Sequence, residues 1–166
     1  SADFNLGTED ITLSVTSPVT VINTQKLQNG GGSFNFLGGL SLEAGSELIG
    51  QGKQVSGNIV LNGGQIATEQ NTVLTDNLTQ SADSTLQIDT SKTLTYSGAV
   101  VDIGTSKLNI QGGGSFINSA VSALSLNNAD SHLVLDNVSV GFVSGSAASN
   151  SSKGLVVSVD STLTTL

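Results

Sequence analysis

Hydrophobic and polar positions recur along this chain in a fixed order. Two aliphatic residues lie two positions apart, a small polar turn follows, and a third aliphatic residue comes after the turn. The clearest copy is Leu40-Ser-Leu-Glu-Ala-Gly-Ser-Glu-Leu48. Because residues two apart in a strand point to the same face, Leu40, Leu42 and Leu48 are expected to share one interior. The pattern therefore predicts short strands joined by tight turns.

The pattern occurs repeatedly, with an aliphatic opening residue and an aliphatic closing residue about eight positions later. The openers are Val19, Leu40, Ile59, Leu78, Val101, Leu124 and Leu155, and the closing residues are Leu27, Leu48, Ile66, Leu86, Leu108, Leu133 and Leu163. The steps between openers are 21, 19, 19, 23, 23 and 31 residues long. The position two after the opener is aliphatic as well, except at Gln80.

A period of about 20 residues with short alternating strands favours one architecture. It is too short for a propeller blade, and the fixed Asn and the helical half of leucine-rich repeats are missing. The sequence therefore predicts an all-β fold, a single-stranded parallel β-helix (β-solenoid) of about seven coils. Successive coils stack about 4.8 Å apart, so aliphatic residues form continuous columns. In such a stack, Glu47 is expected to lie over Lys26 of the preceding coil and to form a weak ion pair with it.

A longer motif occurs twice. Gly30-Gly-Gly-Ser-Phe34 and Gly112-Gly-Gly-Ser-Phe116 are each preceded by Lys-Leu and followed by Leu-Ser-Leu. Matched flanks on both sides argue against chance. The two copies lie about four units apart and are expected to occupy the same place in their coils.

Two regions depart from the repeat. Residues 1–18 contain one alternating strand, Ile11-Thr-Leu13-Ser-Val15, which Pro18 ends because proline lacks the amide donor of a β-ladder. We expect residues 1–18 to be an N-terminal cap or a strand that pairs with a neighbouring molecule, and residues 19–166 to form the solenoid. The 31-residue step contains a small, polar stretch, residues 143–154, which is expected to project as a loop from one corner.

These units resemble coils of the right-handed β-helix superfamily. The resemblance rests on Leu40-Ser-Leu-x-x-x-Ser-x-Leu48, on Ser131-His-Leu-Val-Leu-Asp-Asn-Val-Ser-Val140, and on Gly154-Leu-Val-Val-Ser158 followed by Ser161-Thr-Leu163. The style is closest to autotransporter passengers and other bacterial surface adhesins, and the resemblance covers residues 19–166. It implies the handedness of the solenoid and a location that is secreted, at the cell surface or in the extracellular matrix. It implies a fold more strongly than an activity.

Charge and composition narrow the range of partners. The sequence contains thirteen acidic residues and five lysines, which give a net charge of −8. Nucleic acids and anionic membrane surfaces require clustered basic residues, so neither is expected as a partner. The absence of Cys removes disulfides and thiolate chemistry, and no apolar run is long enough for insertion into a membrane.

Few residues could carry chemistry. A carbohydrate-cleaving pair would have to come from Asp83, Asp89, Asp102, Asp130, Asp136 and Asp160. Asp83, Asp130 and Asp160 directly precede turn serines, where a hydrogen bond to the backbone is the expected role. His132 is the only histidine and is expected to face solvent, so no zinc site is predicted. We expect no catalytic residue, cofactor or metal, and a structural calcium ion at a turn is the one alternative that the sequence leaves open.

Aromatic residues and Thr-x-Thr motifs offer two further candidates for binding surfaces. Tyr96 is a candidate for one rung of a sugar-binding surface. The phenylalanines expected in the core or at corners are Phe34, Phe36, Phe116 and Phe142. Thr93-Leu-Thr95 and Thr162-Leu-Thr164 have the form of ice-binding rungs, but they do not repeat from unit to unit.

These observations favour a protein without enzymatic activity. We expect an extracellular structural solenoid that serves as a stalk, an adhesin segment or a self-associating fibre subunit. Its partners would be copies stacked end to end, the continuation of a longer solenoid, or a host or matrix glycan or protein. The candidate interaction surfaces are Ile11, Leu13, Val15, Ser144, Ser146, Asn150, Leu163 and Leu166. The alternatives are a carbohydrate-binding or carbohydrate-cleaving β-helix and, more weakly, an ice-binding protein.

Overall fold

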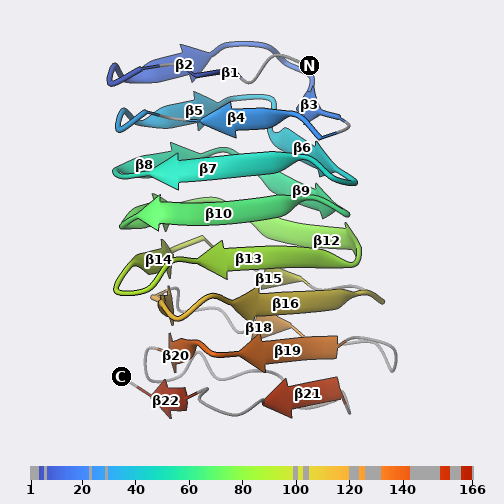
Figure 1. Cartoon of the computed structure of the whole chain (residues 1–166). Coiled ribbons are helices and arrows are strands. Elements are labelled where there is room, and N and C mark those ends of the chain that lie inside the picture. The colour runs from blue at the N-terminus through green and yellow to red at the C-terminus, as the bar shows by residue number, and fades with distance from the viewer. Residues whose placement is uncertain are drawn as a thin grey trace.

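The computed structural model of the chain is a stack of short strands wound around one axis (Figure 1). It describes residues 4–5, 7–22, 24–28, 30–98, 101–102, 105–119, 124–125, 132–142, 154–157 and 162–165. All regular structure within these residues is β-strand, and every strand pair in the sheets is parallel. The all-β parallel solenoid predicted from the repeat is therefore confirmed.

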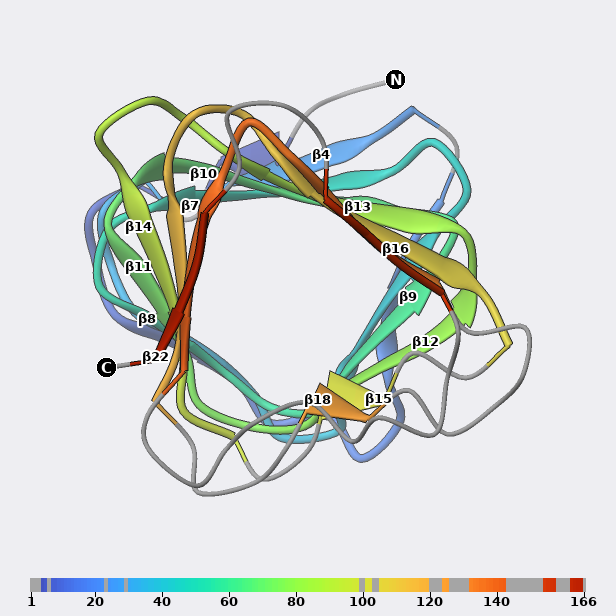
Figure 2. The same ribbon diagram turned by 90° about the horizontal axis from the view of Figure 1, so that it is seen from below.

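Three parallel sheets form the walls of the stack, and Figure 2 shows them around the central axis. Sheet A contains β1 (Phe4–Asn5), β4 (Lys26–Gln28), β7 (Glu47–Gln51), β10 (Gln65–Gln70), β13 (Ser84–Ile88), β16 (Lys107–Gln111), β19 (His132–Asp136) and β21 (Gly154–Val157). Sheet B contains β2 (Ile11–Leu13), β5 (Phe34–Phe36), β8 (Gln54–Ser56), β11 (Thr72–Leu74), β14 (Thr93–Tyr96), β17 (Ser115–Asn118), β20 (Ser139–Phe142) and β22 (Thr162–Thr165). Sheet C contains β3 (Val19–Val21), β6 (Leu40–Glu43), β9 (Ile59–Asn62), β12 (Leu78–Ala82), β15 (Val101–Asp102) and β18 (Leu124–Ser125).

Sheet C confirms the repeat for its first six units. The openers lie in register from strand to strand, Val19 with Leu40, Leu40 with Ile59, Ile59 with Leu78, Leu78 with Val101, and Val101 with Leu124. The chain makes about five full turns between β3 and β18, fewer than the seven coils expected. Among the described residues, sheets A and B each contain two more strands than sheet C, because β19 to β22 follow β18 without a further strand of sheet C between them.

The prediction for the seventh unit is wrong. Leu155 lies in sheet A, where it pairs with Leu133, and Leu163 lies in sheet B, where it pairs with Val140. Residues 133 and 155 are 22 positions apart, which is the length of an ordinary coil, so no 31-residue step exists. Alternation alone does not reveal which wall a strand joins, and this ambiguity caused the error. The predicted projecting loop falls on residues 143–153, which lie outside the described residues, and on Gly154, which begins β21.

The closing column is also displaced at one point. Leu86 pairs with Ile110, whereas Leu108 lies level with Ser84 and then pairs with Leu133. The expected column is therefore continuous from Leu27 to Leu86 and moves by one inward position at β16. Leu108 occupies the inward position that Ser84 holds in the preceding coil, so its larger side chain keeps the interior filled where the register changes.

The inward side chains form one continuous core along the stack. Leu40, Leu42 and Leu48 are each at most 1% exposed, as their spacing predicted. Burying a side chain of this size contributes about 1.5–3 kcal/mol, so repeating columns offset the entropy lost on ordering short strands. The described phenylalanine side chains Phe34, Phe36 and Phe116 belong to the core, as expected.

The two Gly-Gly-Gly-Ser-Phe motifs occupy the same corner, between sheets A and B, four strands apart in sheet B. The first two glycines of each copy have φ between +49° and +113°, a region that side chains disfavour. The third glycine, Gly32 or Gly114, faces the backbone of the preceding coil so closely that a Cβ would overlap it. The repeated motif therefore marks a repeated corner.

Gln80 replaces an aliphatic residue inside the stack. Its side chain is 8% exposed, and Nε2 donates hydrogen bonds to the carbonyl oxygens of Ala82 (2.8 Å) and Lys107 (2.6 Å). The Oε1 atom is buried and has no hydrogen-bond partner among the described residues. Gln80 thus links two successive coils at the corner between sheets C and A, and its role is structural.

Candidate functional site

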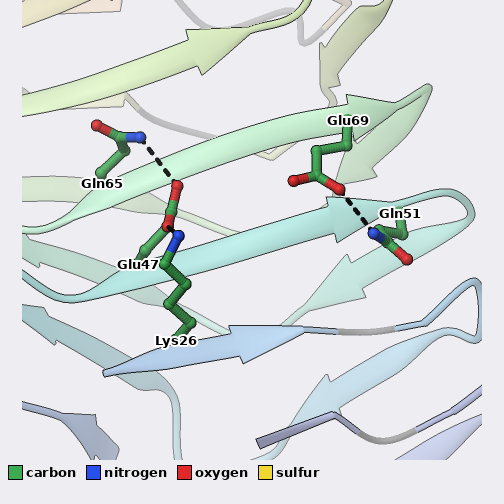
Figure 3. Close-up of polar contacts among 5 residues, drawn as sticks. All are labelled: Lys26, Glu47, Gln51, Gln65 and Glu69. Carbon is green, nitrogen blue, oxygen red and sulfur yellow. Dashed lines mark hydrogen bonds and ion pairs between the residues drawn. The ribbon is translucent and has the colours of Figure 1, made fainter. Parts of the chain in front are cut away.

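The outer face of sheet A carries side chains that bind one another across coils (Figure 3). Lys26 Nζ lies 2.7 Å from Glu47 Oε2, and Gln65 Nε2 donates to Glu47 Oε1 at 3.0 Å. At the other end of the same strands, Gln51 Nε2 donates to Glu69 Oε2 at 2.6 Å. The predicted pairing of Glu47 with Lys26 is confirmed. These contacts hold adjacent coils together and leave the polar groups engaged.

The corners use aspartates to bind backbone amides of neighbouring coils. Asp83 Oδ1 accepts a hydrogen bond from the Lys107 amide at 2.8 Å, and Asp76 Oδ2 accepts one from the Gly57 amide at 2.7 Å. The expected hydrogen bond of Asp83 to backbone is present, although it crosses to the next coil instead of closing the local turn. These carboxylates satisfy amides that the corner leaves outside the sheets.

Asp10 serves the same purpose at the first corner between sheets A and B. It accepts a hydrogen bond from the Ser33 amide at 2.8 Å and lies 3.2 Å from Lys53 Nζ. The amide hydrogen bond, followed by the hydrogen bond and charge of Lys53, lowers the pKa of Asp10 below its ordinary value of 3.8. Both side chains are largely exposed, so this pair is a surface contact.

A depression of about 200 Å³ lies at the corner between sheets C and A. Two carboxylates border it, Glu47 and Asp83, together with the glycines of the turns. Glu47 is held by Lys26 and Gln65, and Asp83 is held by a backbone amide. Both carboxylates therefore take part in contacts between coils.

A second depression, of about 340 Å³, lies on the outer face of sheet B. It spans three successive strands, because Gln54, Val73 and Thr95 are in register on β8, β11 and β14. Thr93 and Lys53 also line it. The side chains of Gln54, Thr93 and Thr95 make no hydrogen bond to another described residue.

The outer face of sheet B has no charged residue at its outward positions among the described strands. These positions, which alternate with buried ones, are Thr12, Asn35, Gln54, Ser56, Val73, Thr93, Thr95, Ser115, Ile117, Ser139 and Gly141. The two Thr-x-Thr motifs both fall in this sheet and in the same two columns, since Thr93 aligns with Thr162 and Thr95 with Thr164 through β17 and β20. Sequence reasoning missed this face because the last unit was assigned to the wrong wall.

The candidate catalytic aspartates do not form a described cluster. Of the six, Asp83 alone borders one of these two depressions, and Asp136 is in register with Gln111. Asp89 follows β13, Asp102 ends β15, and Asp130 and Asp160 lie outside the described residues. Within the described part of the chain, no group of three His, Cys, Asp or Glu side chains could hold a metal ion.

The other singled-out residues have clear positions. His132 is exposed at the start of β19, as expected. Tyr96 was a candidate for a sugar-binding surface, and this prediction is wrong, because its side chain points inward and is 0% exposed. Its hydroxyl accepts a hydrogen bond from the Leu78 amide at 3.3 Å. The alternation of β14, with Thr93 and Thr95 outward, forces Tyr96 into the core.

Four of the predicted interaction residues lie in the described part of the chain, namely Ile11, Leu13, Val15 and Leu163. Ile11 and Leu13 lie in β2, pair with Phe34 and Phe36, and are partly buried, whereas Val15 is 49% exposed. Leu163 lies in β22. The remaining candidates are outside the described residues: Ser144, Ser146, Asn150 and Leu166. Their role as interaction surfaces stays a prediction, as does that of residues 1–18 as a cap or exchanged strand.

Comparison with known proteins identifies no relative. No protein-family model, no curated protein and no solved structure matches this chain. Among the described residues, no helix is long and apolar enough to cross a membrane.

Proposed function

We propose that this chain is a structural β-solenoid of an extracellular or cell-surface assembly, serving as a stalk, an adhesin segment or a self-associating fibre subunit. The observation that carries the proposal is the continuity of three parallel sheets over a single core. A rod of this kind transmits load through stacked backbone hydrogen bonds and column packing. We include in this proposal the resemblance of the repeat units to those of autotransporter passengers and other bacterial surface adhesins.

The use of the acidic side chains supports a structural role. Asp10, Asp76 and Asp83 bind backbone amides of neighbouring coils, and Glu43 accepts hydrogen bonds from Ser41 (2.7 Å) and Asn62 (2.6 Å). These groups hold the coils together. The proposal accordingly assigns the chain no reaction and no cofactor.

The N-terminal end of the stack supports association along the axis. Ile11 and Leu13 face inward but are only partly buried, whereas their partners one coil further, Phe34 and Phe36, are at most 2% exposed. The strands β1, β2 and β3 are terminal in their sheets and have one partner strand each among the described residues. A further parallel coil, from another copy or from a longer solenoid, would pair with these edges and bury these side chains.

Light scattering and electron microscopy of the concentrated protein test the self-associating form of the proposal. We expect rods longer than one molecule, and we expect Leu13→Lys to shorten them because it places a charge at the inward edge. Thr12→Lys, on the outward face of the same strand, is the matched control and should leave the rods intact. A monodisperse monomer at high concentration would overturn self-association. Release of reducing sugars from a polysaccharide would overturn the structural assignment.

A further inference from the structure

We propose that the depression on the outer face of sheet B binds a segment of a neutral glycan. The site consists of Gln54 on β8, Val73 on β11, and Thr93 and Thr95 on β14, with Asn71 beside them. It lies on a lateral wall and not on an end of the stack. The inference therefore does not depend on whether copies associate along the axis.

The charge of the site indicates an uncharged ligand. Among the described residues, the only charged side chain that lines the depression is Lys53, whose ammonium group lies 3.2 Å from the Asp10 carboxylate. The outward positions of sheet B carry no charge in a chain whose net charge is −8. An acidic ligand would find little cationic complement here, and a basic ligand would find a better one on the acidic remainder of the surface.

The hydrogen-bonding groups of the site indicate a ligand rich in hydroxyls. The Gln54 amide offers both donors and an acceptor, and the hydroxyls of Thr93 and Thr95 each donate and accept. None of the three side chains is engaged by another described residue. Gln54 and Thr95 lie in register on either side of Val73, two strand spacings or about 9.6 Å apart, and Thr93 lies two residues before Thr95 on β14, so the three groups can meet hydroxyls of neighbouring sugar units along a chain.

Shape and apolar contact complete the match to a sugar. Val73, partly buried in the middle of the site, presents an aliphatic floor to the C–H face of a sugar ring. The volume of about 340 Å³ lies near the lower end of ligand-binding clefts, which are roughly 300–1,000 Å³. A short glycan segment fits these dimensions. Ice, the other uncharged hydroxyl-rich ligand, would require Thr-x-Thr rungs on successive coils, whereas Ser115 with Ile117 and Ser139 with Gly141 stand between the two Thr-x-Thr motifs of this sheet.

Titration of the full chain with neutral oligosaccharides tests the proposal. The probes are hexasaccharides of glucose, mannose, xylose and galactose, with oligogalacturonate as the charged comparison, followed by calorimetry and by amide shifts in NMR spectra. We expect at least one neutral probe to bind, with shifts centred on β8, β11 and β14, and weaker binding of oligogalacturonate. Thr95→Val, which removes one hydroxyl but keeps the shape, should weaken binding about three- to tenfold.

Thr85→Val is the matched control, because Thr85 is a partly exposed, outward threonine on β13 of sheet A, in the same coil as Thr95. It should leave binding unchanged, and both variants should keep the wild-type unfolding temperature. The proposal is overturned if no neutral probe binds up to its solubility limit, if Thr85→Val weakens binding as much as Thr95→Val, or if oligogalacturonate binds best. Thermal hysteresis that is lost in Thr95→Val but kept in Thr85→Val would reassign the face to ice.

Discussion

The outer faces of sheets A and B lie on the same coils and over the same core, yet their polar side chains differ in whether they bind one another across coils. On sheet A, Glu47 binds Lys26 and Gln65 from the adjacent coils. On sheet B, Thr93 and Thr95 leave their hydroxyls without a partner among the described residues. One face is therefore occupied by its own contacts, and the other is open to a ligand.

Side-chain length and the identity of the neighbour in register both contribute to this difference. Neighbouring strands are about 4.8 Å apart, a distance that Lys, Glu and Gln side chains span easily. A threonine hydroxyl is one bond from Cβ and cannot reach the hydroxyl of the next coil at hydrogen-bond distance. Glu47 therefore bridges coils, whereas the hydroxyls of Thr93 and Thr95 stay without a partner among the described residues. Gln54 is long enough to bridge, but its neighbour in register on β11 is the apolar Val73.

The largest predicted loss of stability comes from core substitutions, which test whether sheets A and B share one core. Leu86→Ala beneath sheet A and Leu94→Ala beneath sheet B each remove a side chain that is 0% exposed, and each should lower the free energy of unfolding by about 2–5 kcal/mol. Urea denaturation measures both. A loss below about 1 kcal/mol in either variant would show that one wall packs loosely, contrary to the continuous core.

Substitution of the corner aspartates should lower the free energy of unfolding by a smaller amount, which should be similar at the corner that leads into sheet A and at the corner that follows sheet B. Asp83→Ala and Asp76→Ala each leave a backbone amide without its carboxylate, and each should cost about 0.5–2 kcal/mol of unfolding free energy. Asn at either position keeps an acceptor oxygen and should retain most of the stability. Should Asn prove as harmful as Ala, the carboxylates would be acting through charge and not as amide acceptors.

The ion pair of sheet A should have a still smaller effect that depends on salt. Glu47→Gln removes the charge that faces Lys26, whose side chain is 48% exposed, so the loss should stay below about 1 kcal/mol and should vanish at high ionic strength. Thr95→Val on sheet B is the control and should show no dependence on salt. A loss for Glu47→Gln that persists in high salt would contradict the assignment to a screened ion pair.

The smallest predicted effect concerns acid. The pKa of Asp10 is lowered in the folded chain, first by the Ser33 amide and then by Lys53. Its contribution to stability is therefore present above the unfolded-state pKa and is lost as the pH falls through the folded-state pKa, below the ordinary value of 3.8. NMR titration of the carboxyl group measures the shift, and Asp10→Asn should abolish this part of the acid dependence. Titration of Asp10 above 3.8 would contradict the prediction.

Sequence reasoning succeeded where neighbouring coils have similar lengths. The openers from Val19 to Leu124 lie in one column, and Glu47 meets Lys26, because steps of 19 to 23 residues leave little freedom in the alignment. It failed at Leu155, which has the same alternating neighbours as an opener but lies in sheet A. It also failed at Tyr96, for which composition suggested a surface and the alternation of β14 requires the core.

Alternation along each strand specifies which side chains face the core, because that property depends only on residues two positions apart. Gly-Gly-Gly-Ser-Phe likewise specifies its corner, since positive φ and close backbone approach both demand glycine. Which wall a strand joins, and which side chains meet across coils, depends on hydrogen bonds between residues about 20 positions apart. Only the tertiary structure resolves that register, and with it the contrast between the occupied face of sheet A and the open face of sheet B.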